Sequence, residues 1–335
     1  MSDILDALYG EREKRLFQAE AEEYCGCFTE FIKPAWAVLK PAEPYHHNWH
    51  IDAIGEHLEA VSRGEVKRLQ IWVPRATMKS MNVSIFWPAW EWACIGSWIR
   101  YWTASYELGL AGRLAGKTRD LMASDWYRNR WPTFNLLKEG ERYYSNDQGG
   151  TRLATAPGST ALGEHGHRII IDDPINAAAA DATSRVVLEA TNEWYDATVQ
   201  GSKADPMSAA EVIIMQRLHE NDLAAHALSR EDWTVLCLPE RYEGNHPYAW
   251  RRDPRNEGDL LWPSHRDETA SDALARSLGS HRAAGQMQQR PSAREGEILK
   301  RHWWRFYHPH LFQDEELKNR RPRFQAVVQS IDCPQ

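Results

Sequence analysis

Apolar residues of this chain gather in short runs, and the segments between the runs have a helical pattern of apolar and polar positions. The runs occupy residues 68–73, 99–105, 168–172, 212–216 and 234–238. Short β-branched runs that alternate with helical segments are typical of a mostly parallel sheet with crossover helices. Two further helices are expected at 2–24 and 50–62, ahead of the sheet. The pattern therefore predicts an α/β fold with a helical N-terminal segment.

The pattern changes after residue 240, where Pro, Gly, Arg and Asp become frequent (EGNHPYAWRRDPRNEGD). Such a composition indicates a loop-rich subdomain, with one helix expected near 271–289. We therefore divide the chain into an N-terminal segment (1–62), a core (63–240), a lid or linker subdomain (241–300) and a final segment (301–335).

Composition narrows the class of protein. Hydrophobic residues make up 42% and charged residues 26% of the 335 residues, as in a globular protein. No apolar run approaches the roughly 18 residues that span a bilayer, and the charged stretch 1–24 does not form a signal peptide. We therefore expect an intracellular protein with no membrane partner.

The net charge of −7 argues against a surface that is basic all over, so contact with nucleic acid would be local. Two stretches are candidates for it, residues 300–305 (KRHWWR) and 320–323 (RRPR). The alternative is a solvated basic linker packed by Trp303 and Trp304.

The cysteines, at positions 25, 27, 94, 237 and 333, are scattered without the spacing of a disulfide framework. This arrangement predicts reduced thiols. A zinc site built from Cys25 and Cys27 with nearby histidines is an alternative, but the Cys-x-Cys pair lacks the gap usual in zinc modules.

A candidate phosphate-binding loop follows the first apolar run, in the stretch IWVPRATMKS (71–80). The next segment has the apolar face of a helix, at Val83, Phe86, Trp87, Trp90 and Cys94. A loop between a strand and a helix directs backbone N–H groups at an anion, while Lys79 adds a charge and Ser80 a hydroxyl for magnesium. Glycines are missing from it, so Met78 implies a differently shaped turn. Taken alone the motif is weak, because strand, turn and helix with a Lys-Ser pair also occur by chance.

Paired acids end the strand HRIIIDDP (167–174). Parallel α/β sheets bind ligands at the carboxyl ends of their strands. In a nucleotide hydrolase Asp172 would hold magnesium, and Asp173 would orient or deprotonate the attacking water. The alternative is that Asp-Asp-Pro only terminates the strand, but its combination with the Lys-Ser loop favours a nucleotide site. We therefore expect Lys79 and the two carboxylates to converge on one triphosphate.

A third strand, VIIMQRLH (212–219), ends in polar residues at the same edge. Gln216 is a candidate sensor of the γ-phosphate, and Arg217 is a candidate partner of a phosphate or of an acid. Alternatively, these two side chains cap the strand and the helix that begins near Asn221.

Together these stretches resemble the large subunit of tailed-phage terminases, the motor that packages DNA. The resemblance covers nearly the whole chain and is carried by NWHIDAIGEHLEAV (48–61), VPRATMKS (73–80), FWPAWEWA (86–93), ASY (104–106), RIIIDDP (168–174), NEWYDAT (192–198), MQRLHENDLAAH (215–226) and GQMQQRPSAREGEILKRHWWRFY (285–307). It implies an ASCE, RecA-like P-loop NTPase, with a mostly parallel sheet flanked by helices. The family tolerates a proline-arginine loop without glycines, but residues 75–78 depart from its usual filling, which leaves the loop geometry open.

The resemblance also assigns roles at the nucleotide. Trp49 and His50 would lie near the adenine of ATP, and the loop that contacts the phosphates would comprise Pro74, Arg75, Ala76, Thr77, Met78, Lys79 and Ser80. Ser80 and Asp172 would hold Mg²⁺. Asp173 takes the position of the catalytic carboxylate, which is commonly glutamate, and the shorter side chain leaves Glu164 as an alternative base.

The resemblance also implies which residues couple hydrolysis to movement and which supply a catalytic arginine. Gln216 and Arg217 would belong to the segment that couples hydrolysis to movement. Arg75 is a candidate catalytic arginine within its own subunit, and Arg113 and Arg119 are candidates for reaching a neighbouring subunit.

The function implied is ATP-driven translocation of double-stranded DNA into a procapsid, in the host cell cytoplasm and transiently at the procapsid vertex. The expected partners are the portal protein, the small terminase subunit and further copies of the chain, in a ring that forms on the procapsid from monomers. Another DNA-dependent ATPase or helicase of this fold, and a nucleotide-binding assembly scaffold that hydrolyses nothing, are the alternatives.

Terminases also carry an RNase H-like nuclease domain. The stretch FQAVVQSID (324–332) resembles its first strand, with Asp332 as the leading acid. One acid cannot build a two-metal site. We therefore expect this chain to be the motor half, without nuclease activity.

Overall fold

The computed structural model of the protein describes residues 2–159, 163–179 and 182–291. Within them an eight-stranded sheet runs in the order β3-β4-β5-β2-β6-β7-β1-β8. The strands are β1 (Arg68–Trp72), β2 (Arg100–Ser105), β3 (Leu136–Glu139), β4 (Tyr143–Asn146), β5 (Thr151–Thr155), β6 (Arg168–Asp172), β7 (Ala210–Met215) and β8 (Thr234–Cys237). All neighbouring pairs from β5 to β8 are parallel, whereas β3 and β4 pair antiparallel with their neighbours. The predicted α/β fold with a mostly parallel sheet is therefore confirmed.

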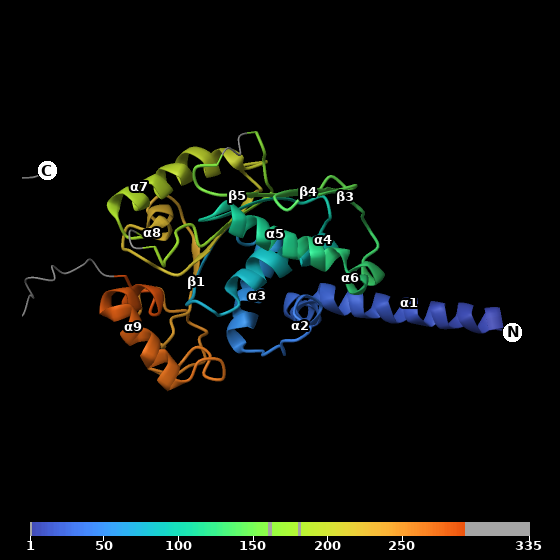
Figure 1. Cartoon of the computed structure of the whole chain (residues 1–335), viewed down its shortest axis with the longest axis horizontal. Helices are drawn as coiled ribbons and strands as arrows, with labels where there is room; N and C mark the ends of the chain where they lie inside the picture. Colours follow the sequence, from blue (N-terminus) through green and yellow to red (C-terminus); the bar gives the residue numbers. More distant parts are fainter. Residues whose placement is uncertain (1, 160–162, 180–181, 292–335) are drawn as a thin grey trace, which may run out of the picture. The chain divides into compact units, whose positions relative to one another are not determined.

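Helices cover both faces of this sheet (Figure 1). The helices of the described residues are α1 (Ser2–Gly26), α2 (Phe28–Leu39), α3 (Trp49–Ser62), η1 (Met81–Phe86), α4 (Trp87–Cys94), α5 (Leu108–Ala123), α6 (Asp125–Arg130), α7 (Arg185–Trp194), η2 (Tyr195–Val199), η3 (Gln200–Ser202), α8 (Leu223–Leu228) and α9 (Glu268–Gln286). Alternate residues of one strand enter different cores. Ile170 packs with residues of α2–α5, while Ile169 and Ile171 pack with residues of α7 and α8. Burial on both faces explains why the central strands read as unbroken apolar runs.

Strands β3, β4 and β5, which extend the sheet beyond β2, were not predicted, and neither was helix α2. These strands are four or five residues long, and the burial along β4 and β5 alternates or is partial. Short strands of mixed polarity give little periodic signal. Helix α2 contains Pro34, which also weakens a helical pattern.

The helix after the loop differs from its prediction. Residues Met81–Phe86 form a π-helix, and the α-helix proper begins at Trp87. The predicted apolar positions Val83, Phe86, Trp87 and Trp90 are buried, but Asn82, Ser84 and Glu91 are buried too, so burial is not confined to one face. Contacts with α2, α3 and α5 cover the side of this segment that faces away from the sheet.

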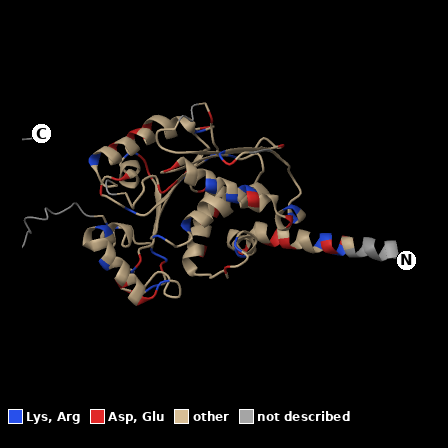
Figure 2. Cartoon of the chain, in the orientation of Figure 1, with Lys and Arg blue, Asp and Glu red and all other residues tan. Residues whose placement is uncertain are grey.

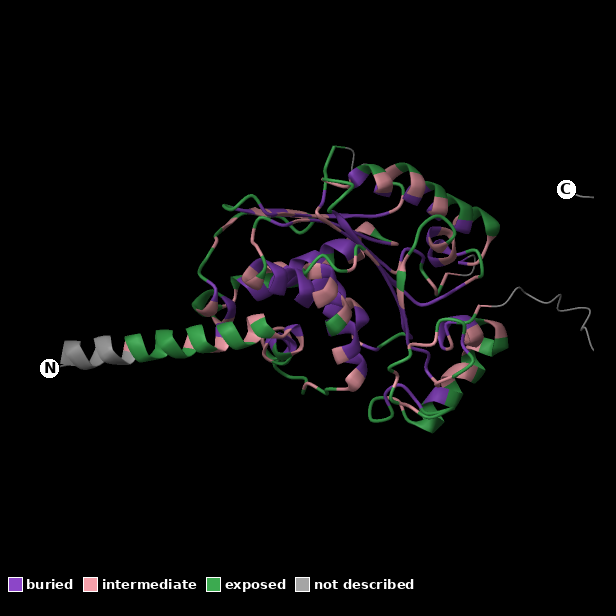
Figure 3. Ribbon diagram, turned by 180° about the vertical axis from the view of Figure 1, so that it is seen from behind, coloured by how far each residue is buried: buried purple, intermediate pink, exposed green. Residues whose placement is uncertain are grey.

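The N-terminal helix α1 carries charges of both signs along its described side chains (Figure 2). Most of those side chains are exposed, and burial increases only toward its C-terminal end (Figure 3). Among the side chains that the structure describes, Ala21 is the first along the chain that belongs to the main core. The charged half of α1 therefore contributes little to the buried surface.

Several predicted features lie outside the described residues: the basic stretches at 300–305 and 320–323, Cys333, and the segment 301–335 with Asp332. None of the helices in the described ranges is long and apolar enough to cross a membrane.

The expectation of reduced thiols is wrong for two cysteines. Cys25, near the end of α1, forms a disulfide with Cys94, the last residue of α4, across a separation of 69 residues. The sequence did not reveal this pair because the fold, and not the spacing, brings the ends of the two helices together. The bond also removes Cys25 from the alternative zinc site. No group of three or more His, Cys, Asp or Glu in the described ranges is placed to hold a metal ion.

We expect reduction of this disulfide to lower the stability of the folded chain. A disulfide that closes a loop of this length raises the free energy of the unfolded chain by up to about 4 kcal/mol, because it lowers the conformational entropy of that chain. The midpoint of urea unfolding should therefore fall when dithiothreitol is added. The variant Cys94→Ser should unfold at the lower midpoint with or without the reductant. Cys27, which is free and half-buried, provides the control Cys27→Ser, which should respond to the reductant as the wild type does. Equal midpoints for reduced and oxidised wild type would contradict the bond.

Candidate functional site

The loop after β1 makes its turn without glycine. Ala76 and Met78 have φ angles of 62° and 59°, in the left-handed region that glycine normally occupies. Such conformations cost on the order of 1–3 kcal/mol each and persist where the surroundings hold them. This is the loop geometry that the sequence left open.

Three hydrogen bonds to loop carbonyls hold it. His50 Nε2 lies 3.1 Å from the Thr77 carbonyl oxygen, and the Thr77 hydroxyl donates to the Pro74 carbonyl at 2.8 Å. Arg266, from the segment before α9, donates to the Arg75 carbonyl at 2.9 Å. The carbonyls are therefore turned toward the protein.

The acids at the end of β6 meet the residues at the end of this loop. Lys79 Nζ lies 2.5 Å from Asp173 Oδ1. The Ser80 hydroxyl donates to Asp172 Oδ1 at 2.9 Å, and the Ser84 hydroxyl donates to Asp172 Oδ2 at 2.6 Å. Strand β7 lies between β1 and β6 in parallel register, which brings the three carboxyl ends to one edge.

Burial shifts the pKa of the Asp172 carboxylate. Asp172 is 3% exposed. Desolvation, reinforced by the charge of Asp173, raises the pKa of Asp172 to about 6, while Lys79 and the two serine hydroxyls oppose the shift. A cation at this position would favour the ionised carboxylate.

Two buried polar atoms beside these acids have no partner among the described residues, Gln216 Oε1 and Ser105 Oγ. Ser105 ends β2 and is the register partner of Asp172, and the Gln216 N–H donates to Asp173 Oδ1 at 3.3 Å. Buried polar groups are almost always satisfied, so these atoms call for a polar ligand or water. A carboxylate with a neighbouring hydroxyl is also the oxygen donor set that Mg²⁺ takes when it is shared with phosphates. The residues present therefore fit a magnesium–phosphate group.

A cavity of about 410 Å³ opens next to the loop, with Ala76, Met78, Trp36, His46, Trp262 and His265 among its lining residues. Trp49 and His50 do not line it. His50 is fully buried, and Trp49 stacks on Trp250 with an interplanar angle of 3°. The structure thus places His50 behind the loop, and the adenine contacts assigned to these two residues stay predictions.

Among the described residues, no hydrogen bond or ion pair joins Arg75, Arg113 or Glu164 to Asp172 or Asp173, and the roles assigned to the candidate arginines stay predictions. Arg75 and Arg113 are exposed, and Arg119 bonds to Asp120 on its own helix. Glu164 is exposed, and Gly166, two residues later, pairs with Lys203 before β6 begins. Because β6 then runs about 16 Å to Asp172, the structure does not bring Glu164 to the site.

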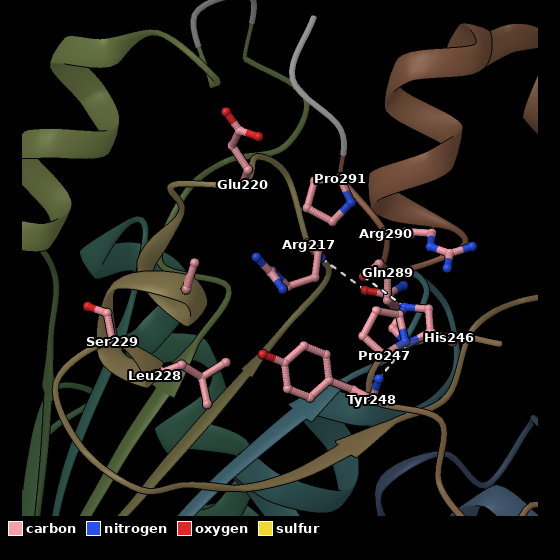
Figure 4. Close-up of a pocket in the computed structure, with 11 residues that line it drawn as sticks. Arg217, Glu220, Leu228, Ser229, His246, Pro247, Tyr248, Gln289, Arg290 and Pro291 are labelled. Carbon is pink, nitrogen blue, oxygen red and sulfur yellow. Dashed lines mark hydrogen bonds between the residues drawn. The ribbon is translucent and has the colours of Figure 1, made fainter.

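Arg217 pairs with an acid, which is one of the two kinds of partner that the sequence predicts for it. Its Nε lies 3.0 Å from both oxygens of Asp222, and its guanidinium stands 4.4 Å from the centre of the Trp72 ring. Arg217 and Tyr248 line a cavity of about 430 Å³. The backbone N–H of Arg217 donates to Gln289 Oε1 at 2.9 Å, the dashed bond between these two residues in Figure 4. Of the two coupling candidates, Gln216 reaches Asp173, and Arg217 links the end of β7 to the segment after α9.

Sequence reasoning missed three residues around Asp172. Ser84 follows Ser80 by four positions, a spacing that puts both hydroxyls on one helix face, so this signal was available. Ser105 ends a strand that was predicted, but its hydroxyl was not considered. Arg152 belongs to β5 and gave no signal.

A mostly parallel sheet with an anion loop after β1, acids after β6 and one strand between them defines an α/β, RecA-like P-loop fold. No protein-family model and no curated protein matches the chain, but solved structures do. A mutant of the large terminase ATPase domain of Thermus phage P74-26 is similar, with 12% identity and a TM-score of 0.45, over 77% of this chain and 98% of that one.

Two longer chains are similar as well. The large terminase of bacteriophage HK97 has 11% identity and a TM-score of 0.49, over 79% of this chain and 55% of that one. The large terminase of the thermophilic bacteriophage D6E, solved in complex with ADP, has 9% identity and a TM-score of 0.40, over 69% of this chain and 52% of that one. This chain spans about half the length of these two. The function therefore has to be inferred from the chain's own residues.

We expect His50 to make the stability of the folded chain depend on pH. Burial lowers the pKa of His50 from 6.5 to about 4, against the opposing hydrogen bond to the Thr77 carbonyl. Between pH 6.5 and pH 4 the imidazole is therefore protonated in the unfolded chain and neutral in the folded chain. This difference lowers the free energy of unfolding by about 2 kcal/mol at pH 5 relative to pH 7.5.

The variant His50→Gln should lose this contribution, so the difference in unfolding free energy between wild type and variant should change by that amount between the two pH values. Urea titrations at both pH values measure it, and the opposite contribution of Asp172 cancels in the difference. His46→Gln, at an exposed position, is the matched control. A pH-independent difference would show that His50 does not titrate as a buried neutral imidazole.

Proposed function

We propose that this chain is the ATP-hydrolysing motor subunit of a DNA-packaging machine of the large-terminase kind. The observation that supports it most is the meeting of Lys79, Asp172 and Asp173 at the carboxyl edge of a RecA-like sheet. A lysine, a metal-type carboxylate and a second acid at one edge form the set that nucleotide hydrolysis requires. The resemblance to large terminases supports the choice of a DNA-packaging motor among the enzymes of this fold.

The residues would divide the chemistry as follows. The loop N–H groups and Lys79 would bind the β- and γ-phosphates, for which Lys79 must leave Asp173. Mg²⁺, held by Ser80 and Asp172, would neutralise charge on the phosphates. Asp173, released from Lys79, would then orient or deprotonate the attacking water.

Gln216 suits the role of γ-phosphate sensor. Its backbone already contacts Asp173, and its side-chain oxygen is buried without a partner. A water that donates to this oxygen would link occupancy of the site to β7. Through Arg217 and Gln289, the same strand end is tied to the segment after α9. We propose that phosphate release acts on that segment along this route.

The cavity beside Ala76 and Met78 would receive the base and ribose of ATP, because it adjoins the loop and has aromatic side chains on its wall. Double-stranded DNA, a portal protein, a small terminase subunit and neighbouring copies in a ring would be the partners. DNA held by its phosphates would dissociate steeply with salt. An arginine from a neighbour, with Arg113 and Arg119 as candidates, would make the ring faster than the lone chain.

The first test is ATP turnover by wild type and Lys79→Ala, each with and without procapsid components. The variant should lose about 10²–10³-fold in turnover, because it lacks the charge that binds the phosphates. Lys117→Ala, at an exposed position of α5, is the matched control and should turn over as the wild type does.

Three results separate the functions. Turnover that procapsids stimulate, without strand separation, supports the packaging motor. Strand separation of a DNA duplex would indicate a helicase. Nucleotide binding with equal background turnover in wild type and Lys79→Ala would indicate a scaffold that does not hydrolyse.

The second test identifies the base. Asp173→Asn keeps the shape of the side chain but removes its charge, and should lower turnover by about 10²–10⁴-fold. Glu164→Gln should leave turnover within about twofold, because Glu164 lies toward the other end of β6. Single-turnover hydrolysis at saturating ATP measures both. The opposite ranking would transfer the catalytic role to Glu164 and require a rearrangement of residues 163–167.

A further inference from the structure

Arg152, on strand β5, is a buried guanidinium without an acidic partner. It is 1% exposed, and among the described residues no carboxylate pairs with it. By contrast, the partly buried Arg168 and the buried Arg217 pair with Glu91 and Asp222. Burying an unpaired charge costs free energy, so the hydrogen bonds from Arg152 to uncharged groups are needed to offset that cost.

These contacts join β5 to the segment that follows the loop. Arg152 Nη2 donates to the Ser84 carbonyl at 2.6 Å, and Nη1 donates to the Thr118 hydroxyl at 2.9 Å. The Thr118 hydroxyl itself lies 3.3 and 3.2 Å from the carbonyls of Ser84 and Ile85. The guanidinium and the hydroxyl therefore bind the same turn of η1.

Pro88 explains why this turn accepts an outside donor. In an α-helix the Ser84 carbonyl would accept from the N–H of residue 88, and proline has none. The backbone here forms a π-turn, in which the Trp87 N–H bonds to the Asn82 carbonyl. π-Turns are frequent at functional sites, and this one carries the Ser84 hydroxyl that donates to Asp172 Oδ2.

We propose that Arg152 is a positioning residue for the metal-binding carboxylate Asp172, acting through Ser84. By fixing the Ser84 carbonyl it fixes the direction of the Ser84 hydroxyl, which holds one carboxylate oxygen and leaves the other oriented toward Ser80. Groups that orient a metal ligand in this way commonly change metal affinity by about 10–100-fold when removed. The inference rests on the proposed function, because it takes Asp172 as a ligand of Mg²⁺.

The test measures binding of a fluorescent, non-hydrolysable ATP analogue as a function of Mg²⁺ concentration, and separately in EDTA. Arg152→Met should raise the Mg²⁺ concentration for half-maximal binding by about 10–100-fold and change affinity in EDTA by less than about threefold. Ser84→Ala should do the same. In the double variant the Mg²⁺ concentration for half-maximal binding should be no higher than in the more affected single variant, because both substitutions remove the same linkage. Arg152→Lys, which keeps the charge but not the planar fork, should fall between wild type and Arg152→Met.

Arg168→Met is the control for loss of a partly buried arginine from the same sheet. Arg168 starts β6, at the other end of the strand from Asp172, and pairs with Glu91. This variant should unfold at a lower urea concentration without a change in the Mg²⁺ requirement. Should Arg152→Met fail to fold, Arg152→Lys and Ser84→Ala carry the comparison.

The outcomes separate the two claims. A wild-type chain that binds no nucleotide at any Mg²⁺ concentration overturns the proposed function and this inference with it. Normal Mg²⁺ dependence in wild type, with an unchanged requirement in the folded Arg152 variants or with additive effects of Arg152→Met and Ser84→Ala, overturns the positioning role alone.

Discussion

The buried carboxylate of Asp172 joins the sheet to the helices that cover it. An ionisable group in this position is tolerated only when hydrogen bonds and nearby charges replace the lost water. Ser80 and Ser84 supply those hydrogen bonds from the segment that leaves the loop, so the end of β6 and the start of η1 hold each other in place. The neighbouring pair of Lys79 and Asp173 adds a second link across the same edge. A change at any of these residues therefore reaches both the loop and the sheet.

Hydrogen bonds to its carbonyl groups hold the loop after β1 in its conformation. Ala76 and Met78 occupy backbone conformations that glycine would adopt more easily, and His50, Thr77 and Arg266 hold the adjacent carbonyls. The contacts of His50 and Arg266 come from α3 and from the segment before α9, so parts of the chain far from the loop in sequence help to determine its shape. This explains how a turn with two left-handed residues can form without glycine. It also gives the buried His50 a role behind the loop in addition to any contact with a base.

The strands β3, β4 and β5 extend the sheet beyond the part needed for the loop and the acids. Through Arg152 the last of them reaches the turn that Pro88 prevents from being α-helical. A proline in a helix leaves a carbonyl that some other donor must satisfy. In this chain the donor comes from β5, and the turn that it binds also carries a hydroxyl to Asp172. The extension is thereby connected to the site by two consecutive hydrogen bonds.

Local patterns determined which strands form the central sheet and which residues stand at their ends. Val and Ile runs, the Lys-Ser pair and the Asp-Asp-Pro ending are properties of neighbouring residues, and the parallel arrangement then places Lys79, Asp172 and Asp173 at one edge. Only the tertiary structure decided that Arg217 meets Asp222, that Cys25 meets Cys94, that His50 lies behind the loop, and that Arg152 supports Ser84. Each of these contacts joins residues whose approach depends on packing, and a buried donor takes whichever acceptor the packed helices bring to it. No spacing along the chain encodes that choice.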